Sequence, residues 1–208
     1  KWLRGNKKLA ISLAPSFVSA FPDWQATRIP SALRMLGADY IAETAIGAYY
    51  VAHKNREHIE RNPTQSHICT SCPAVVTYVE KYAPQLAENL IPVVSPLVAH
   101  ARIIKKDRPE HKLIFIGPCI AKIREIRRPE LKSIVNAAIT FEELKQLFET
   151  NNISLENCEE SSFDEAPAGD SRLFPIEGGL LKTAGMSTDL IDIEHLAISG
   201  AREIQEAL

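Results

Sequence analysis

Short apolar runs that alternate with amphipathic stretches constrain the fold of this chain more than any other sequence feature. The clearest run is "KLIFIGP" (112–118), which is continuous and ends in Gly-Pro. An apolar run of this length is typical of a strand buried on both faces of a sheet. The other stretches predicted as strands are residues 8–14, 39–44, 66–71, 134–139 and 190–199. Because helical stretches lie between them, the sequence predicts an α/β fold with parallel β-sheets flanked by helices.

Apolar residues recur at helical spacing between these runs. The stretches predicted as helices are residues 15–21, 28–37, 47–62, 73–86, 95–106, 140–152, 178–185 and 200–208, with a further helix that starts after Cys119. In the stretch 140–152, Thr140 and Glu143 have the spacing of a capping box. The acidic stretch 156–175 contains Gly and Pro, interrupts the alternation and predicts a long surface excursion.

The composition is that of a soluble globular protein, with 45% hydrophobic and 24% charged residues. The net charge of -2 and the lack of like-charge blocks argue against a nucleic-acid or anionic-membrane partner. No apolar run reaches the roughly 20 residues of a membrane span, and the N-terminus does not resemble a signal peptide. We therefore expect a cytoplasmic protein. The first residue is Lys1 rather than methionine, so we expect a fragment of a longer chain.

The chain contains four cysteines, too few for a secreted scaffold held together by disulfides. They are Cys69, Cys72, Cys119 and Cys158. Cys72 and Cys119 each follow a predicted strand and precede a predicted helix, where free backbone N–H groups stabilise a thiolate. Because the carboxyl ends of parallel strands lie at one edge of a sheet, these two cysteines are predicted to share a site. Taken singly, each is equally consistent with a buried structural cysteine.

The stretch "CTSCP" (69–73) allows three kinds of site. A redox dithiol fits the strand–Cys-x-x-Cys–helix order, but Pro73 follows the pair rather than separating it. A zinc site needs about four ligands, and the spacing of His53 and His58 points them to different faces of one helix. An iron–sulfur site is the third alternative.

The segments around Cys72 and Cys119 resemble the catalytic H-domain of iron-only, or [FeFe], hydrogenases. That family carries a T-S-C-C-P motif, then V-E-x-x-x-P, S-P and P-C-x-x-K-x-x-E. The matching residues here are Cys72-Pro73, Val79-Glu80 with Pro84, Ser95-Pro96, and Pro118-Cys119 with Lys122 and Glu125. Ala14, Pro15 and Ser16 in "SLAPSF" resemble the family's A-P-A/S motif beside its active site. "AAITFEELKQLF" and "GGLLKTAG" are similar to two further family segments.

The resemblance implies two lobes, about 1–110 and 111–208, with parallel sheets and a cluster site in the cleft between them. It also implies an H-cluster, a [4Fe-4S] cubane joined through a cysteine to a diiron unit with CO and cyanide ligands. Cys72 and Cys119 match two of the four cysteine ligands. The others come from a later C-x-x-x-C motif that this sequence does not contain, so we expect the cluster to be absent or incomplete here. Lys122 is implied to donate to a cyanide nitrogen, and Gly117 and Pro118 to lie beside the diiron unit.

Some positions depart from the family pattern. Ser71 stands where hydrogen-producing members have the proton-donating cysteine, and a hydroxyl is a far weaker acid than a thiol. Asn55 and His58 replace acidic residues of the proton path, Gly117 replaces a methionine, and Cys69 matches no ligand. These departures resemble a sensory subgroup attached to PAS and other signalling domains. They imply a slow oxidoreductase that acts on hydrogen and protons and exchanges electrons with an iron–sulfur domain or ferredoxin. A non-catalytic iron–sulfur scaffold, or a thiol–disulfide protein using Cys69 and Cys72, is the alternative.

Overall fold

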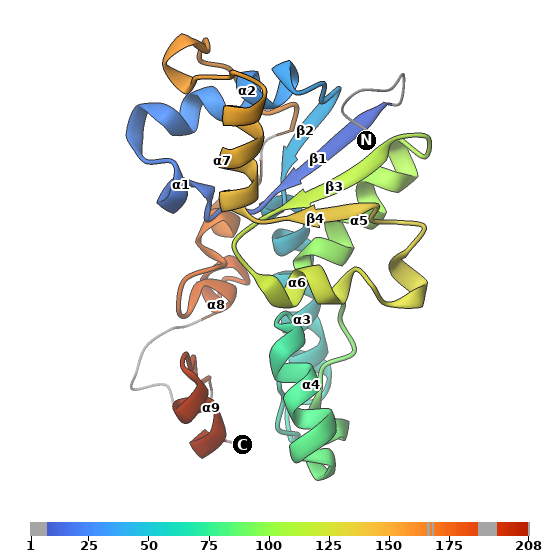
Figure 1. The fold of residues 1–208 in the computed structure, drawn as a ribbon. Coiled ribbons are helices and arrows are strands. Elements are labelled where there is room, and N and C mark those ends of the chain that lie inside the picture. Colours follow the sequence, from blue (N-terminus) through green and yellow to red (C-terminus); the bar gives the residue numbers. More distant parts are fainter. Residues whose placement is uncertain (1–7, 166, 168, 187–194, 208) are drawn as a thin grey trace.

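The computed structural model describes residues 8–165, 167, 169–186 and 195–207. Its four strands form one parallel sheet in the order β2-β1-β3-β4 (Figure 1). The strands are β1 (Leu9–Leu13), β2 (Tyr40–Glu43), β3 (Lys112–Ile116) and β4 (Ala137–Ile139). Every residue of β1 is buried, as expected for a strand with a neighbour on each side and helices on both faces. The continuous apolar pattern of the sequence therefore marks the centre of the sheet.

Helices cover both faces of this sheet (Figure 1). Leu33 of α2 and Leu144 of α7 line an apolar hollow on one face, together with Ile11 of β1. On the other face α5 contacts β1, and α3 packs along α5. The helices are α1 (Phe17–Ala20), α2 (Ile29–Met35), α3 (Ala45–Arg61), α4 (Pro73–Tyr82), α5 (Pro96–Asp107), α6 (Ile120–Glu125), α7 (Phe141–Thr150), α8 (Gly179–Thr183) and α9 (Ala201–Ala207). None of the described helices combines the length and apolarity that crossing a bilayer requires.

The α/β fold, the parallel sheet and the flanking helices predicted from the sequence are confirmed. The capping box is also present, with Thr140 Oγ1 accepting from the Glu143 backbone N–H at 3.1 Å. The helix predicted over 73–86 ends at Tyr82 and is followed by a 3-10 turn, because Pro84 has no N–H to continue the helix.

Two predicted strands differ from the observed structure. Residues 66–71 make only one isolated bridge, from Ile68 to Leu90, and the polar residues that follow Ile68 turn toward α4 instead of entering the sheet. The strand predicted at 190–199 lies partly outside the described residues, and residues 195–199 have no regular structure.

The expectation of a sheet in each of two lobes is corrected. Among the described residues all four strands belong to one sheet, and β1 pairs with β3 across position 110. The pairing has a physical reason, because β3 offers β1 a second apolar edge in a fully buried position. The division of the chain into two lobes at that position stays a prediction.

Two internal contacts hold α3 and α5 on the sheet. A Cβ on Gly47 of α3 would lie 2.2 Å from the Pro96 carbonyl oxygen, so the two helices approach to a distance that only glycine permits. Below them, the Ser12 hydroxyl lies 2.8 Å from Thr44 Oγ1 and 2.7 Å from His100 Nδ1. This polar group is buried, and burial lowers the pKa of His100 to about 3. His100 is therefore a neutral hydrogen-bonding residue.

Replacing Gly47 with alanine is expected to lower the free energy of unfolding by about 3 kcal/mol, because the methyl group collides with backbone of α5. Urea-induced unfolding followed by circular dichroism measures this. Tyr50→Ala on the exposed side of the same helix is the control, with an expected change below about 0.5 kcal/mol. Equal effects of the two substitutions would contradict the close helix approach.

His100 also predicts a pH dependence of stability. Its folded pKa lies below its unfolded value, so the unfolded state binds the extra proton and stability falls as pH falls below about 6.5. When the pH is lowered from about 7.5 to about 4.5, the free energy of unfolding should decrease in both proteins. The decrease should be about 3 kcal/mol smaller in His100→Asn than in the unmodified protein. His53→Asn, at an exposed position on α3, should behave like the unmodified protein. If the free energy of unfolding depended on pH in the same way in His100→Asn and in the unmodified protein, the pH dependence could not be assigned to His100.

Candidate functional site

Cys72 and Cys119 occupy equivalent places in the fold. Cys72 is the N-cap of α4, with φ and ψ of -98° and 111°, and Cys119 is the N-cap of α6, with -95° and 114°. Both side chains are exposed, and neither caps its helix by a hydrogen bond. The free N–H groups in the first turns of both helices, which in α4 begin after Pro73, therefore remain available to a negatively charged group. The predicted placement of both cysteines at helix N-termini agrees with the structure.

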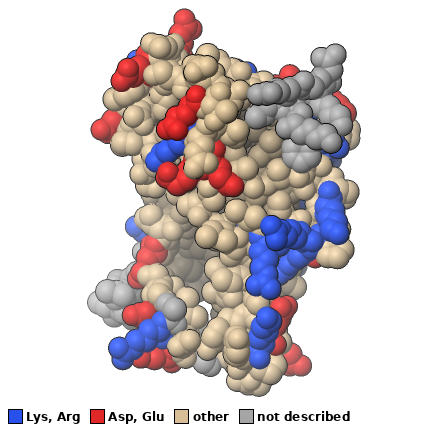
Figure 2. All heavy atoms as spheres, viewed as in Figure 1, with Lys and Arg blue, Asp and Glu red and all other residues tan. Residues whose placement is uncertain are grey.

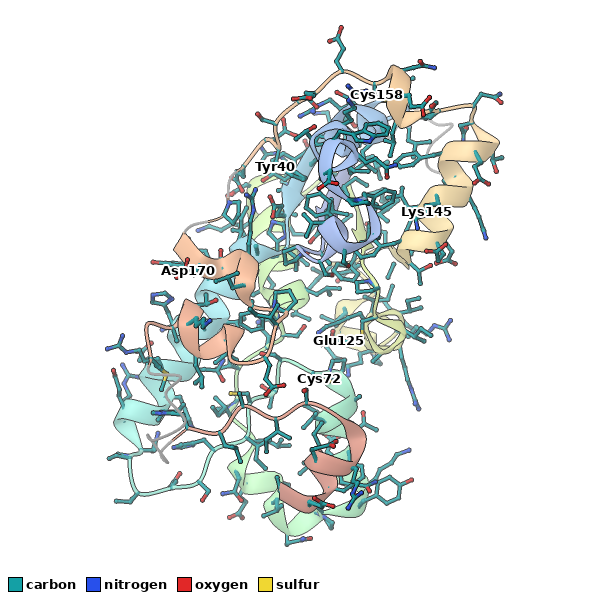
Figure 3. All side chains as sticks on the ribbon, turned by 90° about the vertical axis from the view of Figure 1, so that its left-hand side faces the viewer. Tyr40, Cys72, Glu125, Lys145, Cys158 and Asp170 are labelled. Carbon is teal, nitrogen blue, oxygen red and sulfur yellow. The ribbon has the colours of Figure 1, made fainter. Side chains whose placement is uncertain are left out.

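Lys122 connects the two cysteine-bearing segments. Its Nζ atom donates to the Ser71 carbonyl oxygen at 3.0 Å and to Glu125 Oε2 at 2.9 Å. The Lys122 side chain is 13% exposed and that of Glu125 is 6% exposed, so the ion pair is largely shielded from water. Helices α4 and α6 are also in contact, and Figure 3 labels Cys72 and Glu125 in this part of the molecule. Ser71, which precedes Cys72, is thus joined to α6, the helix that begins after Cys119.

The ends of β1 and β3 meet beside Cys119. The Ala14 N–H donates to the Ile116 carbonyl at 2.8 Å, and a Cβ on Gly117 would lie 2.9 Å from the Ala14 Cβ. Glycine at position 117 is therefore required for the two loops to approach. Ala14 and Gly117, predicted separately as site residues, are brought together, and Pro118 follows directly as an exposed residue. Pro15 and Ser16 are half-buried in the turn that leads to α1.

The residues predicted to interrupt a proton path have few partners. Ser71 Oγ is buried with no hydrogen-bond partner in the described part of the chain. Asn55 is fully buried in α3, where its amide donates to the Val51 carbonyl at 2.7 Å and its Oδ1 finds no partner among the described residues. His58 instead makes a ring contact with His67, at 5.2 Å between centroids. No hydrogen bond links these three side chains to one another in the described residues.

Cys69 and Cys158 differ from the two N-cap cysteines, although all four are free thiols. Burial raises the pKa of Cys69 to about 11, so its thiol is protonated at neutral pH. Cys158 is buried, its Sγ lies 3.8 Å from the Met35 sulfur, and burial raises its pKa as well. Both behave as small apolar side chains.

The surface next to Cys119 is basic. Lys and Arg side chains gather over α6 and the turn that follows it (Figure 2), and the exposed ones are Arg124, Arg127, Arg128 and Lys132. None of the four forms an ion pair with another described residue. A positive potential beside the two cysteines favours an anionic group there.

Sequence reasoning missed one charged pair near the sheet edge. Glu43, at the carboxyl end of β2, is fully buried, and Arg172 Nε donates to its two carboxylate oxygens at 3.1 and 2.9 Å. The signal in the sequence was Glu43 directly after the apolar residues of the predicted strand 39–44, since a buried carboxylate requires a partner. Arg172 lies in a 3-10 helix, Gly169–Leu173, far away in the sequence.

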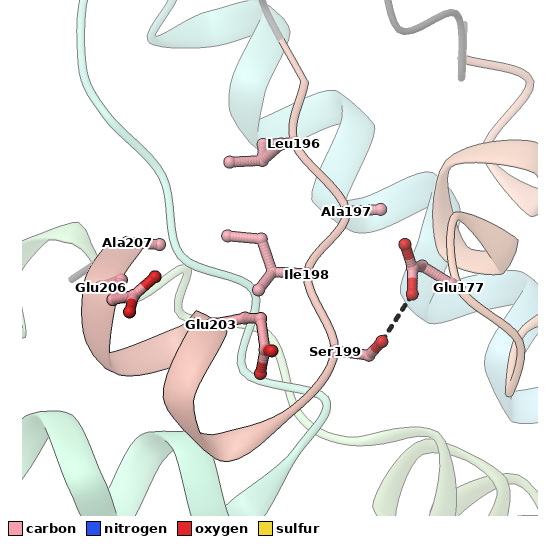
Figure 4. Close-up of a pocket in the computed structure, with 8 residues that line it drawn as sticks. All are labelled: Glu177, Leu196, Ala197, Ile198, Ser199, Glu203, Glu206 and Ala207. Carbon is pink, nitrogen blue, oxygen red and sulfur yellow. Dashed lines mark hydrogen bonds between the residues drawn. The ribbon is translucent and has the colours of Figure 1, made fainter.

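A second hollow lies at the C-terminal end of the described chain, with a volume of about 390 Å³ (Figure 4). Its lining residues are Glu177, Leu196, Ala197, Ile198, Ser199, Glu203, Glu206 and Ala207. No cysteine lines it, and the Ser199 hydroxyl donates to Glu177. Across the described residues, no three His, Cys, Asp or Glu side chains come together as a metal-binding group. Cys72 and Cys119 therefore remain the candidate donors, as a pair.

Known proteins resemble this chain over most of its length. Iron hydrogenase 1 of Clostridium pasteurianum is 27% identical over 97% of this chain and 41% of its own length. The cytosolic Fe-S cluster assembly factor NAR1 of Kluyveromyces lactis is 25% identical over 65% of this chain and 31% of its own length. A solved apo [FeFe]-hydrogenase from Chlamydomonas reinhardtii has a TM-score of 0.69 at 22% identity, over 94% of this chain and 57% of that chain.

The resemblance to the solved structure concerns the fold, and the chain spans about half the length, or less, of the proteins it matches. Residues 7–208 match a single family, described as iron only hydrogenase large subunit, C-terminal domain. That match covers nearly all of the sequence and includes both N-cap cysteines. This chain therefore belongs to the family formed by the C-terminal domains of iron-only hydrogenase large subunits.

Proposed function

We propose that Cys72 and Cys119 supply two of the thiolate ligands of a [4Fe-4S] cubane that forms part of an H-cluster. One observation carries the proposal: two exposed cysteines occupy the N-cap positions of neighbouring helices, and Lys122 of α6 binds the carbonyl of Ser71, the residue before Cys72. A cluster ligated by thiolates is negatively charged, so it gains from two helix N-termini and from the cations beyond α6. Iron–sulfur clusters bind cysteine thiolates, and the donor set fits this chemistry.

The donor set is one half of what a cubane needs. A cubane takes four cysteine ligands, and Cys69 and Cys158 are less accessible than the two N-cap cysteines, because Cys158 is buried and Cys69 is only partly exposed. The two further ligands would come from sequence outside these 208 residues. Loading of these residues alone is therefore expected to be incomplete, because a cluster forms stably only when its ligands are supplied together.

The residues around the pair have distinct roles in this proposal. Lys122 is a donor without acceptor capacity, so it can leave the Ser71 carbonyl and donate to an anionic ligand of the diiron unit, while Glu125 keeps its charge paired. In this proposal, Gly117 and Ala14, which are in close contact, line the site together with Pro118, Pro15 and Ser16. When bound, the diiron unit supplies the redox chemistry that interconverts hydrogen with protons and electrons.

We further propose that the complete protein is a slow or sensory hydrogenase. General acid catalysis requires groups whose pKa lies near the working pH and that reach one another by hydrogen bonds. Ser71 is a poor acid, Asn55 does not ionise, and His58 packs on His67. A protein with this arrangement suits detection of hydrogen or redox state in the cytoplasm, within a chain that also carries signalling domains of the PAS type. Its electrons would pass to an iron–sulfur domain or a ferredoxin.

A non-catalytic iron–sulfur scaffold is the second candidate. It is favoured by the resemblance to NAR1 proteins, including one from Vanderwaltozyma polyspora that is 36% identical over 81 residues. Such a protein would bind a cubane and no diiron unit. Infrared spectra of the full-length protein after maturation separate the two, because CO and cyanide bands appear only with a diiron unit. A thiol–disulfide protein, the third candidate, would show a reversible Cys69–Cys72 disulfide in a redox titration.

The two cysteines of "CTSCP" are expected to differ in iron binding. In the full-length protein reconstituted anaerobically with iron and sulfide, Cys72→Ser should abolish cubane binding, because it removes the exposed sulfur ligand at the N-terminus of α4. Cys69→Ser should leave the iron content nearly unchanged, because Cys69 is not at a helix N-cap and is less exposed than Cys72. Iron per chain and the visible absorption of the cluster measure both. Equal losses in the two variants would show that the pair acts as a joint ligand set.

Turnover is expected to be slow and only partly restored by a thiol. In the matured full-length protein, Ser71→Cys should raise hydrogen evolution from a chemical reductant by about 10-fold, because a thiol with pKa about 8.5 transfers protons far more readily than a hydroxyl. The rate should remain below that of hydrogen-producing relatives, because Asn55 still breaks the path. Ser19→Cys, on an exposed surface, is the matched control and should have no effect. Fast turnover in the unmodified protein would contradict the sensory proposal.

A further inference from the structure

The turn that carries Cys72 has no regular secondary structure of its own. Within residues 66–71, backbone-to-backbone hydrogen bonds form at Ile68, whose N–H donates to the Asn89 carbonyl at 2.8 Å and whose carbonyl accepts from the Ile91 N–H at 3.0 Å. Side chains add two bonds at the start of the stretch: Asn89 Nδ2 lies 2.9 Å from the Ser66 carbonyl oxygen, and His67 Nε2 lies 2.9 Å from the Asn62 carbonyl oxygen. Nothing in the turn itself would hold an exposed N-cap thiolate in one place, since a short irregular segment has few backbone hydrogen bonds. The position of Cys72 therefore depends on side-chain contacts.

Thr70 provides such a contact. Its hydroxyl lies 2.9 Å from the Ile91 carbonyl oxygen and also within hydrogen-bonding distance of the Val93 carbonyl oxygen. Its single proton is shared between two carbonyls of the segment that runs directly into α5. Ile91 is 1% exposed and Val93 is partly buried, so both carbonyls belong to a stretch that is anchored by the Ile91 side chain in the protein interior. The hydroxyl thus ties the turn to a rigid part of the molecule, two residues before Cys72.

The opposite side of the turn is held by Lys122, which donates to the Ser71 carbonyl. Thr70 and Ser71 are adjacent, so the turn is fixed from the α5 side by one contact and from the α6 side by the other. Lys122 is the mobile partner of the two, because a lysine amine can exchange one acceptor for another. Thr70 has a short β-branched side chain with restricted rotation about χ1, so its hydroxyl can keep its contacts when Lys122 turns toward a ligand.

We propose that Thr70 is a positioning residue for Cys72, whose hydroxyl holds the thiolate at the distance from Cys119 that a shared cluster requires. The inference rests on the proposed function, because it assumes that the two cysteines bind one iron–sulfur cluster. Thr70 touches no iron and acts through the backbone of the turn. Residues that orient metal ligands typically change metal affinity by about 10- to 100-fold when they are removed.

The test compares Thr70→Val, which keeps the shape and removes the hydroxyl, with Thr70→Ser, which keeps the hydroxyl. Both are made in the full-length protein and reconstituted anaerobically with iron and sulfide. Thr70→Val should lose its iron to a chelator about 10-fold faster than the unmodified protein and show a broadened EPR signal of the reduced cluster. Thr70→Ser should show the rate of iron loss and the EPR signal of the unmodified protein. Thr77→Val is the matched control, because the Thr77 hydroxyl donates to the Pro73 carbonyl within α4 at 2.8 Å.

Hydrogen exchange of the iron-free proteins gives a readout independent of the cluster. The amides of Ile68 and Ile91 should exchange about five-fold faster in Thr70→Val, because one hydrogen bond that holds the turn is lost. Iron retention equal to that of the unmodified protein in Thr70→Val would overturn the positioning role and leave the proposed function standing. An unmodified protein that takes up no iron would overturn both. Loss of iron in Thr70→Val without rescue by Thr70→Ser would assign the effect to packing and also overturn the inference.

Discussion

The parallel pairing of β1 with both β2 and β3 is the constraint on which the rest of the molecule depends. Because all three strands run in one direction, the loops after Leu13, Glu43 and Ile116 emerge at the same edge of the sheet. Ala14 meets Gly117 there, and Cys119 opens α6 beside them. The direction of the strands alone therefore brings together groups that are distant in sequence, without any contribution from side-chain contacts.

Side-chain contacts position the part of the site that the sheet does not position. Cys72 does not follow a strand of the sheet, and its approach to Cys119 is made by Lys122 on one side and Thr70 on the other. Both contacts are made to backbone carbonyl oxygens, so they fix the path of the backbone and do not involve the two thiols, which remain free. This division suits the proposed cluster site, because backbone contacts supply the position while the thiols remain free to bind.

Much of the fold could be predicted from the sequence, because the strands β1, β2, β3 and β4 consist mainly of apolar residues that favour burial in a sheet covered on both faces. The predicted strand at 66–71 was wrong because one apolar residue between polar neighbours gives little reason to enter a sheet. The N-cap positions of both cysteines followed from local order alone. The contacts of Lys122 and the partner of Glu43 depend on segments separated by 51 and 129 residues, and no local pattern encodes such distances.

The pairing of Glu43 with Arg172 bears on how the chain can be divided. Glu43 is fully buried at the carboxyl end of β2, and the cation that neutralises it comes from a short 3-10 helix in the last fifth of the sequence. A buried carboxylate left without its partner costs about 3–5 kcal/mol, a large part of the stability of a small domain. A shortened protein that stops after α7 would keep every strand of the sheet and still carry this uncompensated charge. The smallest independently stable unit thus extends past the sheet to Arg172, and boundaries chosen from strand positions alone would cut it in two.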